Sequence, residues 1–203
     1  MVVKMRIPLD KICVKSGILC DNCQMKIDKG LYEKWEVDVM KSLLELEDKY
    51  KKETKDLSYK KSIIFDSVLY VIMENIKGGR HEIERYLEKK LKNLGIKKVV
   101  LVEYAENPKE LIYNILNPVK IDNVSIYYSP DGSIYYIVEV PSYEKGRLRD
   151  KEDAVKRIFK VLTKKDIYFE LIDKKGSFVT RKEEELFNQH LDTEKLSKLF
   201  KEL

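Results

Sequence analysis

The sequence predicts an α+β protein in which a helix–strand–strand–helix–strand unit occurs twice. Segments of helical and strand periodicity follow one another in the same order in residues 31–104 and again in residues 107–173. A hydrophobic fraction of 43% is ordinary for a globular protein. No apolar run approaches the roughly 20 residues that cross a bilayer, so we expect no membrane-spanning helix.

The first unit is predicted from segments of regular hydrophobic spacing. Apolar residues recur at three- and four-residue steps over residues 35–50, which indicates an amphipathic helix. Residues 59–74 are rich in β-branched side chains and are typical of two strands. Residues 83–94 have helical spacing and are followed by Gly95, a residue type favoured just after a helix. A strand over residues 98–104 completes the unit.

The second unit repeats this order with clearer boundary signals. Asn107 and Pro108 begin a short helix, because proline at the first helical position loses no hydrogen bond. The helix ends before Pro118. The turn sequence Ser129–Gly132 predicts a hairpin between strands over residues 119–128 and 134–140. Gly146 opens the segment that leads to a helix over residues 154–162, and residues 166–172 form the last strand.

Four regions follow from these patterns. Residues 1–30 are short on core-forming material and contain all three cysteines, residues 31–104 and 105–173 are the two repeated units, and residues 174–203 are a charged tail with helical spacing, which we expect to be a solvated helix. The opening Met1–Pro8 lacks the long apolar stretch of a signal peptide. Three cysteines near one end do not resemble a secreted disulfide framework. We therefore expect a cytoplasmic protein.

The charges and the absence of catalytic motifs argue for a binding protein. There are 40 Lys and Arg residues against 35 Asp and Glu residues, so the net charge of +5 is modest and only its placement can indicate nucleic acid. The sequence contains no P-loop and no nucleotide-binding glycine fingerprint. Neither His81 nor His190 is accompanied by a nucleophile or a paired carboxylate. We expect no enzymatic activity.

The middle of the chain resembles a known family. The order of elements resembles tandem type II KH domains, and Ile96–Tyr104 followed by Glu106–Pro108 and Leu116–Pro118 resembles the junction between the two KH domains of the NusA family. Pro8–Cys23 resembles the zinc-knuckle leader of archaeal NusA-like proteins. The resemblance implies RNA binding in transcription elongation or termination, or in RNA processing. The implied partners are single-stranded or structured RNA, with RNA polymerase or ribosomal proteins as further partners.

The RNA-binding residues follow from the two glycine-containing loops. A KH domain grips single-stranded RNA with a GxxG loop, and neither loop here keeps that spacing, although both keep basic residues that can meet phosphates. The predicted RNA-binding residues are Lys77, Gly78, Gly79, Arg80, His81, Lys145, Gly146, Arg147 and Arg149. Two alternatives stay open. The protein binds RNA with little sequence selectivity, or it has lost RNA binding and serves as an adaptor in the transcription or ribosome machinery.

The cysteines predict a metal site. Cys13-x6-Cys20-x2-Cys23 supplies three of the four ligands that a structural zinc site needs. The resemblance implies a fourth cysteine three residues before Cys13, where this chain has Asp10, and a carboxylate is an acceptable zinc ligand. The predicted Zn²⁺ ligands are Asp10, Cys13, Cys20 and Cys23. The alternative is three reduced cysteines beside a small apolar cluster; an iron centre fits less well, because it normally uses four cysteines.

Tyrosines on the predicted hairpin are a further candidate for RNA contact. Tyr127-Tyr128 and Tyr135-Tyr136 lie on facing strands, and alternation sends one residue of each pair to the outer face. Exposed aromatic rings can stack on bases. Because aromatic residues favour half-buried strands, we expect these tyrosines to pack in the core or at the edge of the sheet.

Overall fold

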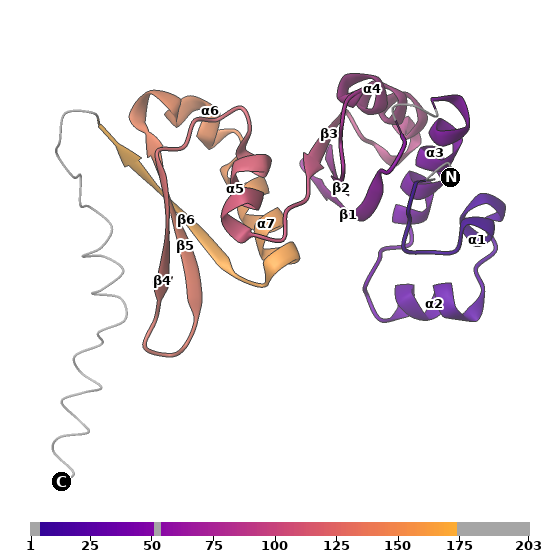
Figure 1. Cartoon of the computed structure of the whole chain (residues 1–203), viewed down its shortest axis with the longest axis horizontal. Coiled ribbons are helices and arrows are strands. Elements are labelled where there is room, and N and C mark those ends of the chain that lie inside the picture. Colours follow the sequence, from indigo (N-terminus) through magenta and orange to yellow (C-terminus); the bar gives the residue numbers. More distant parts are fainter. Residues whose placement is uncertain (1–4, 51–53, 174–203) are drawn as a thin grey trace, which may run out of the picture.

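Two three-stranded sheets and the helices packed on them make up the computed structural model (Figure 1), which describes residues 5–50 and 54–173. The α+β class predicted from the sequence is confirmed. The helix–strand–strand–helix–strand order occurs twice, and we call the segment from α3 to β3 the first repeat and the segment from α5 to β6 the second repeat. The predicted tail, residues 174–203, lies outside the described residues, as does His190.

The N-terminal segment contributes to the core of the first repeat, contrary to the expectation that it holds little core material. It contains helices α1 (Lys11–Ser16) and α2 (Asp21–Asp28). Met5, Leu9 and Val14 are buried in the same cluster as the apolar face of α3. The sequence pattern did not indicate this, because both helices are too short for their periodicity to stand out.

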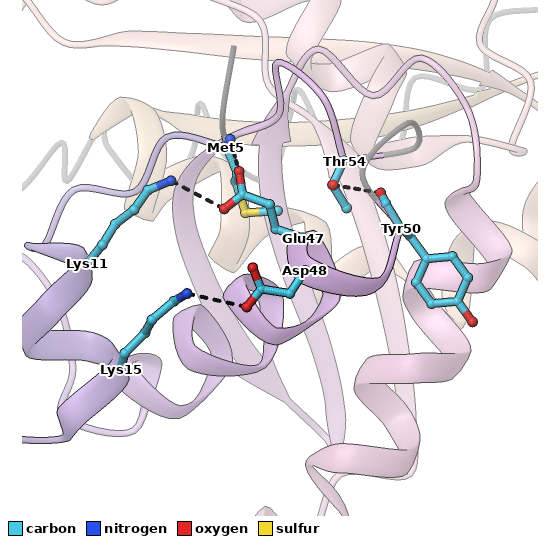
Figure 2. A network of polar contacts seen from close by, with 7 residues as sticks. All are labelled: Met5, Lys11, Lys15, Glu47, Asp48, Tyr50 and Thr54. Atoms are coloured by element: carbon cyan, nitrogen blue, oxygen red, sulfur yellow. Dashed lines mark hydrogen bonds and ion pairs between the residues drawn. The ribbon is translucent and has the colours of Figure 1, made fainter. Parts of the chain in front are cut away.

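Polar contacts fasten α1 to the end of α3, as Figure 2 shows. Lys11 Nζ lies 3.3 Å from Glu47 Oε2, and the backbone N–H of Met5 donates to the other oxygen of that carboxylate at 2.6 Å. Lys15 Nζ lies 3.3 Å from Asp48 Oδ2. The hydroxyl of Thr54 donates to the carbonyl of Tyr50 at 2.7 Å, just beyond the helix end.

The first repeat forms a sheet in the order β1-β2-β3. β1 and β2 are antiparallel and turn at Asp66 and Ser67, both of which have positive φ, while β3 runs parallel to β2 after the crossover helix α4. A parallel neighbour requires such a crossover. The elements are α3 (Glu36–Lys49), β1 (Ser58–Phe65), β2 (Val68–Glu74), α4 (Arg80–Lys90), the 3₁₀ turn η1 (Lys92–Leu94) and β3 (Lys98–Glu103).

The second repeat has the same topology, with order β4-β5-β6, β5 antiparallel to β4 and β6 parallel to β5. Two boundary signals act as predicted. Asn107 Oδ1 accepts the N–H of Lys109 at 3.0 Å to cap α5, and Asp131 Oδ1 accepts the N–H of Ser133 at 2.9 Å in the hairpin turn. The elements are α5 (Pro108–Leu116), β4 (Asn123–Tyr128), β5 (Ile134–Pro141), η2 (Ser142–Glu144), α6 (Lys145–Arg149), α7 (Glu152–Thr163) and β6 (Asp166–Ile172).

The two repeats share a hydrophobic cluster. Ile63, Ile72 and Val102 on one face of the first sheet pack with the apolar residues of α5 and α7, and Figure 1 shows α5 and α7 between the two sheets. The side-chain amide of Asn114 donates to the carbonyl of Glu103 at 3.1 Å across this contact. The first sheet is therefore covered on both faces, whereas helices cover one face of the second.

The outer face of the second sheet carries tyrosines. Tyr127 and Tyr135 stack with ring centroids 5.6 Å apart, and Tyr168 meets Tyr135 edge-on at 5.5 Å. Tyr136 is buried on the other face, so the predicted alternation is confirmed. Tyr127 and Tyr128 are exposed on opposite faces of β4, an edge strand, so the expectation of core or edge positions is confirmed for Tyr127, Tyr128 and Tyr136. No helix among the described residues covers the outer face, on which Tyr127 lies.

Candidate functional site

The first glycine loop forms, but its cations have partners within the protein. Gly79 has a φ of +64° and is the residue before α4, a conformation that glycine adopts without strain. Lys77 Nζ lies 3.1 Å from Asp56 Oδ2. Arg80 donates through Nη1 to the carbonyl of Leu101 at 2.8 Å. His81 is exposed and lies 3.3 Å from Glu84. Gly78 is exposed and adds no charge. One N–H group of the Arg80 guanidinium is therefore used within the protein, and the RNA-binding role of this loop stays a prediction.

Side chains of α4 occupy the outer edge of β3. Glu84 Oε1 accepts the N–H of Leu101 at 2.9 Å, and Glu88 Oε1 accepts the N–H of Val99 at 3.0 Å. Together with Arg80, which reaches the carbonyl of Leu101, they use the backbone groups that an added strand or ligand would need. This edge of the first repeat is closed.

The second predicted loop is a helix, which corrects the sequence interpretation. Lys145, Gly146, Arg147 and Arg149 all lie in α6, and Gly146 has ordinary helical surroundings with no close contact. Arg147 Nη1 lies 3.2 Å from the carboxylate of Glu144, a buried residue. Glycine in a short helix costs only about 1 kcal/mol, so packing of Leu148 into the core overrides the loop signal.

The turn that precedes the long helix of the second repeat is Asp150-Lys151, which directly follows the predicted loop residues Lys145 to Arg149. Lys151 Nζ donates to the carbonyl of Asn117 at 2.7 Å. Burial of this ammonium, and next the charge of Lys98, lower the pKa of Lys151. The turn thus presents one carboxylate and one internally bonded lysine.

A cleft lies between α7 and β6. It has a volume of about 400 Å³ and we call it the α7–β6 cleft; its lining comprises Asp153, Lys156, Arg157, Lys160, Asp166, Ile167 and Tyr168. Lys156 and Lys160 are the fifth and ninth residues of α7, the positions that Glu84 and Glu88 hold in α4. The two repeats therefore place opposite charges at equivalent points beside their third strands.

The edge of β6 beside this cleft differs from the edge of β3 in its contacts with the neighbouring helix. Ile167 and Phe169, the second and fourth residues of β6, correspond to Val99 and Leu101 in β3. Among the described residues, no side chain of α7 hydrogen-bonds to the backbone of Ile167 or Phe169. Phe169 is half-buried and Ile167 is 2% exposed, so neighbouring side chains cover much of this edge although none from α7 hydrogen-bonds to it.

The cations of the α7–β6 cleft differ in how far they are neutralised. Lys156 Nζ lies 2.6 Å from Glu152 Oε1, and Lys160 Nζ lies 2.8 Å from Asp166 Oδ1. The hydrogen bond to Asp166 raises the pKa of Lys160. Arg157 is exposed and forms no ion pair with the residues the structure describes. The sequence interpretation missed these residues; their spacing along the helix was a usable signal, but many solvated helices share it.

The three cysteines come together as predicted. Their Sγ atoms lie within 4.8 Å of one another; Cys13 and Cys23 are buried and Cys20 is exposed. Backbone N–H groups point at two of the sulfurs: that of Asp10 donates to Cys23 Sγ at 3.3 Å and that of Cys20 donates to Cys13 Sγ at 3.4 Å. Zn–S bonds of about 2.3 Å place thiolates of one site at comparable separations, so three thiols are correctly placed for one ion.

Asp10 does not join this group, which corrects its predicted role as a ligand. Its Oδ1 caps α1 by accepting the N–H groups of Ile12 at 2.8 Å and Cys13 at 3.3 Å. The residue follows the N-cap preference of aspartate. Among the described residues, the three cysteines are therefore the candidate metal ligands.

The cysteines differ in acidity. The backbone N–H of Cys23, and then the thiols of Cys13 and Cys23, lower the pKa of Cys20. For Cys13 the N–H of Cys20 lowers the pKa, but burial and the neighbouring thiols together raise it above its ordinary value. Cys20 is thus the exposed thiol, and its lowered pKa makes it more readily ionised than Cys13.

Comparisons with known proteins identify no family. No protein-family model matches the chain, and no curated protein sequence does. A solved structure described as "Crystal structure of APE1850" is similar over 64% of this chain and 96% of its own, with 14% sequence identity and a TM-score of 0.48. None of the helices in the described part of the chain is both long and apolar enough to span a membrane.

Proposed function

We propose that this protein binds single-stranded RNA through the α7–β6 cleft of its second repeat. The observation that carries the proposal is a cleft with three cations beside a strand edge to which no described side chain of α7 hydrogen-bonds, at the place where Glu84 and Glu88 of the first repeat bond to the edge of β3. The sequence resemblance to tandem KH domains supports RNA as the polyanion, and implies a role in transcription or RNA processing.

The chemistry of the cleft suits weak, sequence-tolerant binding. Lys156, Arg157 and Lys160 can meet phosphates, which position a strand without reading its sequence. Backbone groups of the β6 edge can hydrogen-bond to base edges, and the exposed ring of Tyr168 at the rim can stack on a base. Because Asp153 and Asp166 also line the cleft, its charge surplus is small. We expect modest affinity with a shallow salt dependence.

A salt titration of RNA binding tests the proposal. Fluorescence anisotropy of a labelled single-stranded RNA pool should show an affinity that falls linearly with the logarithm of salt concentration. The double variant Lys156→Gln/Lys160→Gln should lower the affinity about tenfold or more, and the salt slope should fall by about 1.4, since each phosphate contact on a single strand contributes about 0.7. Circular dichroism checks that the variant folds.

Lys92→Gln is the matched control, because Lys92 is exposed on η1 and does not line the α7–β6 cleft. It should leave both affinity and slope unchanged. The proposal is wrong if the wild-type protein does not bind RNA at low salt, or if the control weakens binding as much as the cleft variant does.

We also propose that Cys13, Cys20 and Cys23 hold Zn²⁺, with the fourth position filled by a group other than Asp10. Soft thiolates favour zinc, and metal binding would join α1 to α2. Metal analysis of untagged protein should find close to one zinc per chain. Asp10→Cys should lose the helix cap, which costs about 1 kcal/mol in metal-free protein, yet tighten zinc binding by supplying a fourth thiolate. Zinc below about a tenth of an equivalent contradicts the proposal.

An adaptor function is the second candidate, and the outer tyrosine face of the second sheet favours it. Tyr127 and Tyr168 are exposed there, and aromatic residues are enriched at protein interfaces. RNA polymerase or a ribosomal protein would be the partner class. Absence of RNA binding at low salt, combined with a partner contact that Tyr127→Ser disrupts, would favour this function over RNA binding.

A further inference from the structure

A second, larger cleft lies between the two repeats. It has a volume of about 590 Å³ and we call it the inter-repeat cleft. The loop before α3 and strand β1 line one side, and the second half of α7 lines the other. The side chains that matter for the argument are Trp35, Lys60, Lys61, Tyr104, Arg157 and Lys164.

Cations outnumber carboxylates in the lining of the inter-repeat cleft. Its lining contains four cations and, among the described residues, one carboxylate, that of Glu33. Lys60 lies 2.8 Å from Glu74 and Lys61 lies 2.7 Å from the buried Glu36, so both are neutralised. Arg157 and Lys164 form no ion pair with any described residue. Two uncompensated cations therefore face this cleft, more than face the α7–β6 cleft.

Aromatic rings accompany these cations. Trp35 and Tyr104 are half-buried in the lining, and Lys60 Nζ lies 5.1 Å from the centre of the Tyr104 ring. An aromatic wall beside free cations matches a nucleotide, which presents a flat base and a negative phosphate. A volume of this size also holds one or two nucleotides, since ligand sites start at about 300 Å³.

Arg157 connects the two clefts. It lines both the inter-repeat cleft and the α7–β6 cleft, so α7 separates them and its guanidinium is common to both. A strand in the α7–β6 cleft that continues past Arg157 would reach Lys164 and Trp35. Arginine suits this position, because its planar fork can bind successive phosphates or stack on a base.

We infer that the inter-repeat cleft binds nucleotides of the same RNA strand that occupies the α7–β6 cleft. The inference rests on the proposed function and extends the RNA path to a surface that neither glycine-containing segment reaches. It makes Trp35 a base-stacking residue and Lys164 a phosphate-binding residue. The affinity should therefore increase when the RNA is longer than the segment that the α7–β6 cleft alone can hold.

The fluorescence of Trp35 can report whether RNA occupies the inter-repeat cleft. Trp35 is the single tryptophan in the sequence and lines the inter-repeat cleft, whereas the aromatic residue in the α7–β6 cleft is Tyr168. Two RNAs are compared by anisotropy and by tryptophan fluorescence: one of about four nucleotides, the length that a KH domain clamps, and one about twice as long. The longer RNA should quench Trp35 and bind at least tenfold tighter, while the shorter RNA should bind without quenching.

The variant Lys164→Glu tests the inter-repeat cleft independently of the α7–β6 cleft, because Lys164 lines only the former. It should weaken binding of the longer RNA about tenfold and leave binding of the shorter RNA unchanged. The control variant Lys92→Glu should change neither affinity. Lys164 is exposed and lies just after α7, so the variant should fold.

Three results would overturn the inference. Binding of the shorter RNA with no gain in affinity and no quenching by the longer RNA would contradict the inter-repeat site and leave the proposed function standing. Quenching by a free mononucleotide at the concentrations at which the longer RNA saturates would show a nucleotide site independent of a strand. Binding of neither RNA would contradict both proposals.

Discussion

The two repeats share one topology but treat the edge of their third strand in opposite ways. In the first repeat Arg80, Glu84 and Glu88 of α4 hydrogen-bond to the β3 edge. In the second repeat the residues at the same helix positions are Glu152, Lys156 and Lys160, of which Lys156 and Lys160 line a cleft and, like the other described side chains of α7, form no hydrogen bond to the β6 edge. Charged residues at the same helix positions thus bond to the strand edge in one repeat and line a cleft in the other, and the proposed RNA binding of the second repeat rests on this difference.

A second difference concerns the buried carboxylate of each repeat. Glu36 is fully buried and accepts hydrogen bonds from Tyr59, Lys61, Ser62 and the N–H of Glu33 at 2.6–2.8 Å. Glu144 is also buried, and its cationic partner is Arg147, whose side chain is 68% exposed. A buried charge needs several donors, so the carboxylate of the first repeat is the better satisfied.

The largest effect should come from opening the closed edge. Glu84→Ala/Glu88→Ala leaves the N–H groups of Val99 and Leu101 without their partners, which should lower the free energy of unfolding by about 2–4 kcal/mol. The equivalent variant, Lys156→Ala/Lys160→Ala, removes two surface ion pairs and should cost less than about 1.5 kcal/mol. Urea denaturation measures both. Equal losses of stability would contradict the contrast between the two edges.

The next effect concerns Tyr59, whose hydroxyl donates to Glu36 at 2.6 Å. Tyr59→Phe should cost about 1.5–3 kcal/mol at neutral pH, as for a hydrogen bond to a charged group. Burial, and then the charge of Glu36, raise the pKa of Tyr59 well above its ordinary value. The folded state therefore holds this proton more tightly than the unfolded state, so its contribution to stability is present below about pH 10 and is lost as the pH rises further.

Above about pH 10, the free energy of unfolding should therefore fall less in the Tyr59→Phe variant than in the wild-type protein. Urea denaturation over a series of alkaline pH values measures the difference. A decline as steep in Tyr59→Phe as in the wild type would assign the alkaline transition to other tyrosines.

Arg147→Ala should have a smaller effect, of about 1–2 kcal/mol. Breaking a buried ion pair costs about 3–5 kcal/mol, but the guanidinium is 68% exposed and solvent screens much of its interaction. RNA affinity should not change, because Arg147 lines neither cleft. A loss of affinity without loss of stability would restore the RNA-binding role that the sequence predicted for this residue.

Arg80→Ala should have the smallest effect, about 1 kcal/mol for one hydrogen bond to a carbonyl. RNA affinity should again stay the same, since the guanidinium reaches Leu101. Lys89→Ala on the exposed side of α4 is the control and should leave stability within about 0.5 kcal/mol. A tenfold weaker affinity in Arg80→Ala would show that the first glycine loop contacts RNA.

Much of the fold could be predicted from sequence because local signals were consistent with tertiary packing. Asn107 caps its helix, Asp131 closes its hairpin turn, and the alternation around Tyr136 places it in the core as the spacing required. The prediction failed where a residue type suits two environments. Gly146 was interpreted as a loop residue and lies in a helix, and Asp10 was interpreted as a metal ligand and caps one.

The candidate site was less predictable, because it depends on contacts between distant segments. The cysteine cluster was found because its ligands are close in sequence. The α7–β6 cleft was missed, since a basic helix next to a strand has the same pattern whether its charges bond to the strand edge or face solvent. Nothing in the sequence around Arg80 indicates that its guanidinium bonds to Leu101.

The sequence by itself therefore determined the class, the repeated order of elements and the grouping of Cys13, Cys20 and Cys23, because these depend on periodicity, turn residues and short spacings. Only the tertiary structure decided which cations remain available to a ligand. Whether a charged side chain bonds within the protein or faces a cleft depends on what the fold places within about 3 Å of it. Arg80 and Arg157 are both arginines on crossover helices, and their surroundings alone give one a structural role and the other an open cleft on each side.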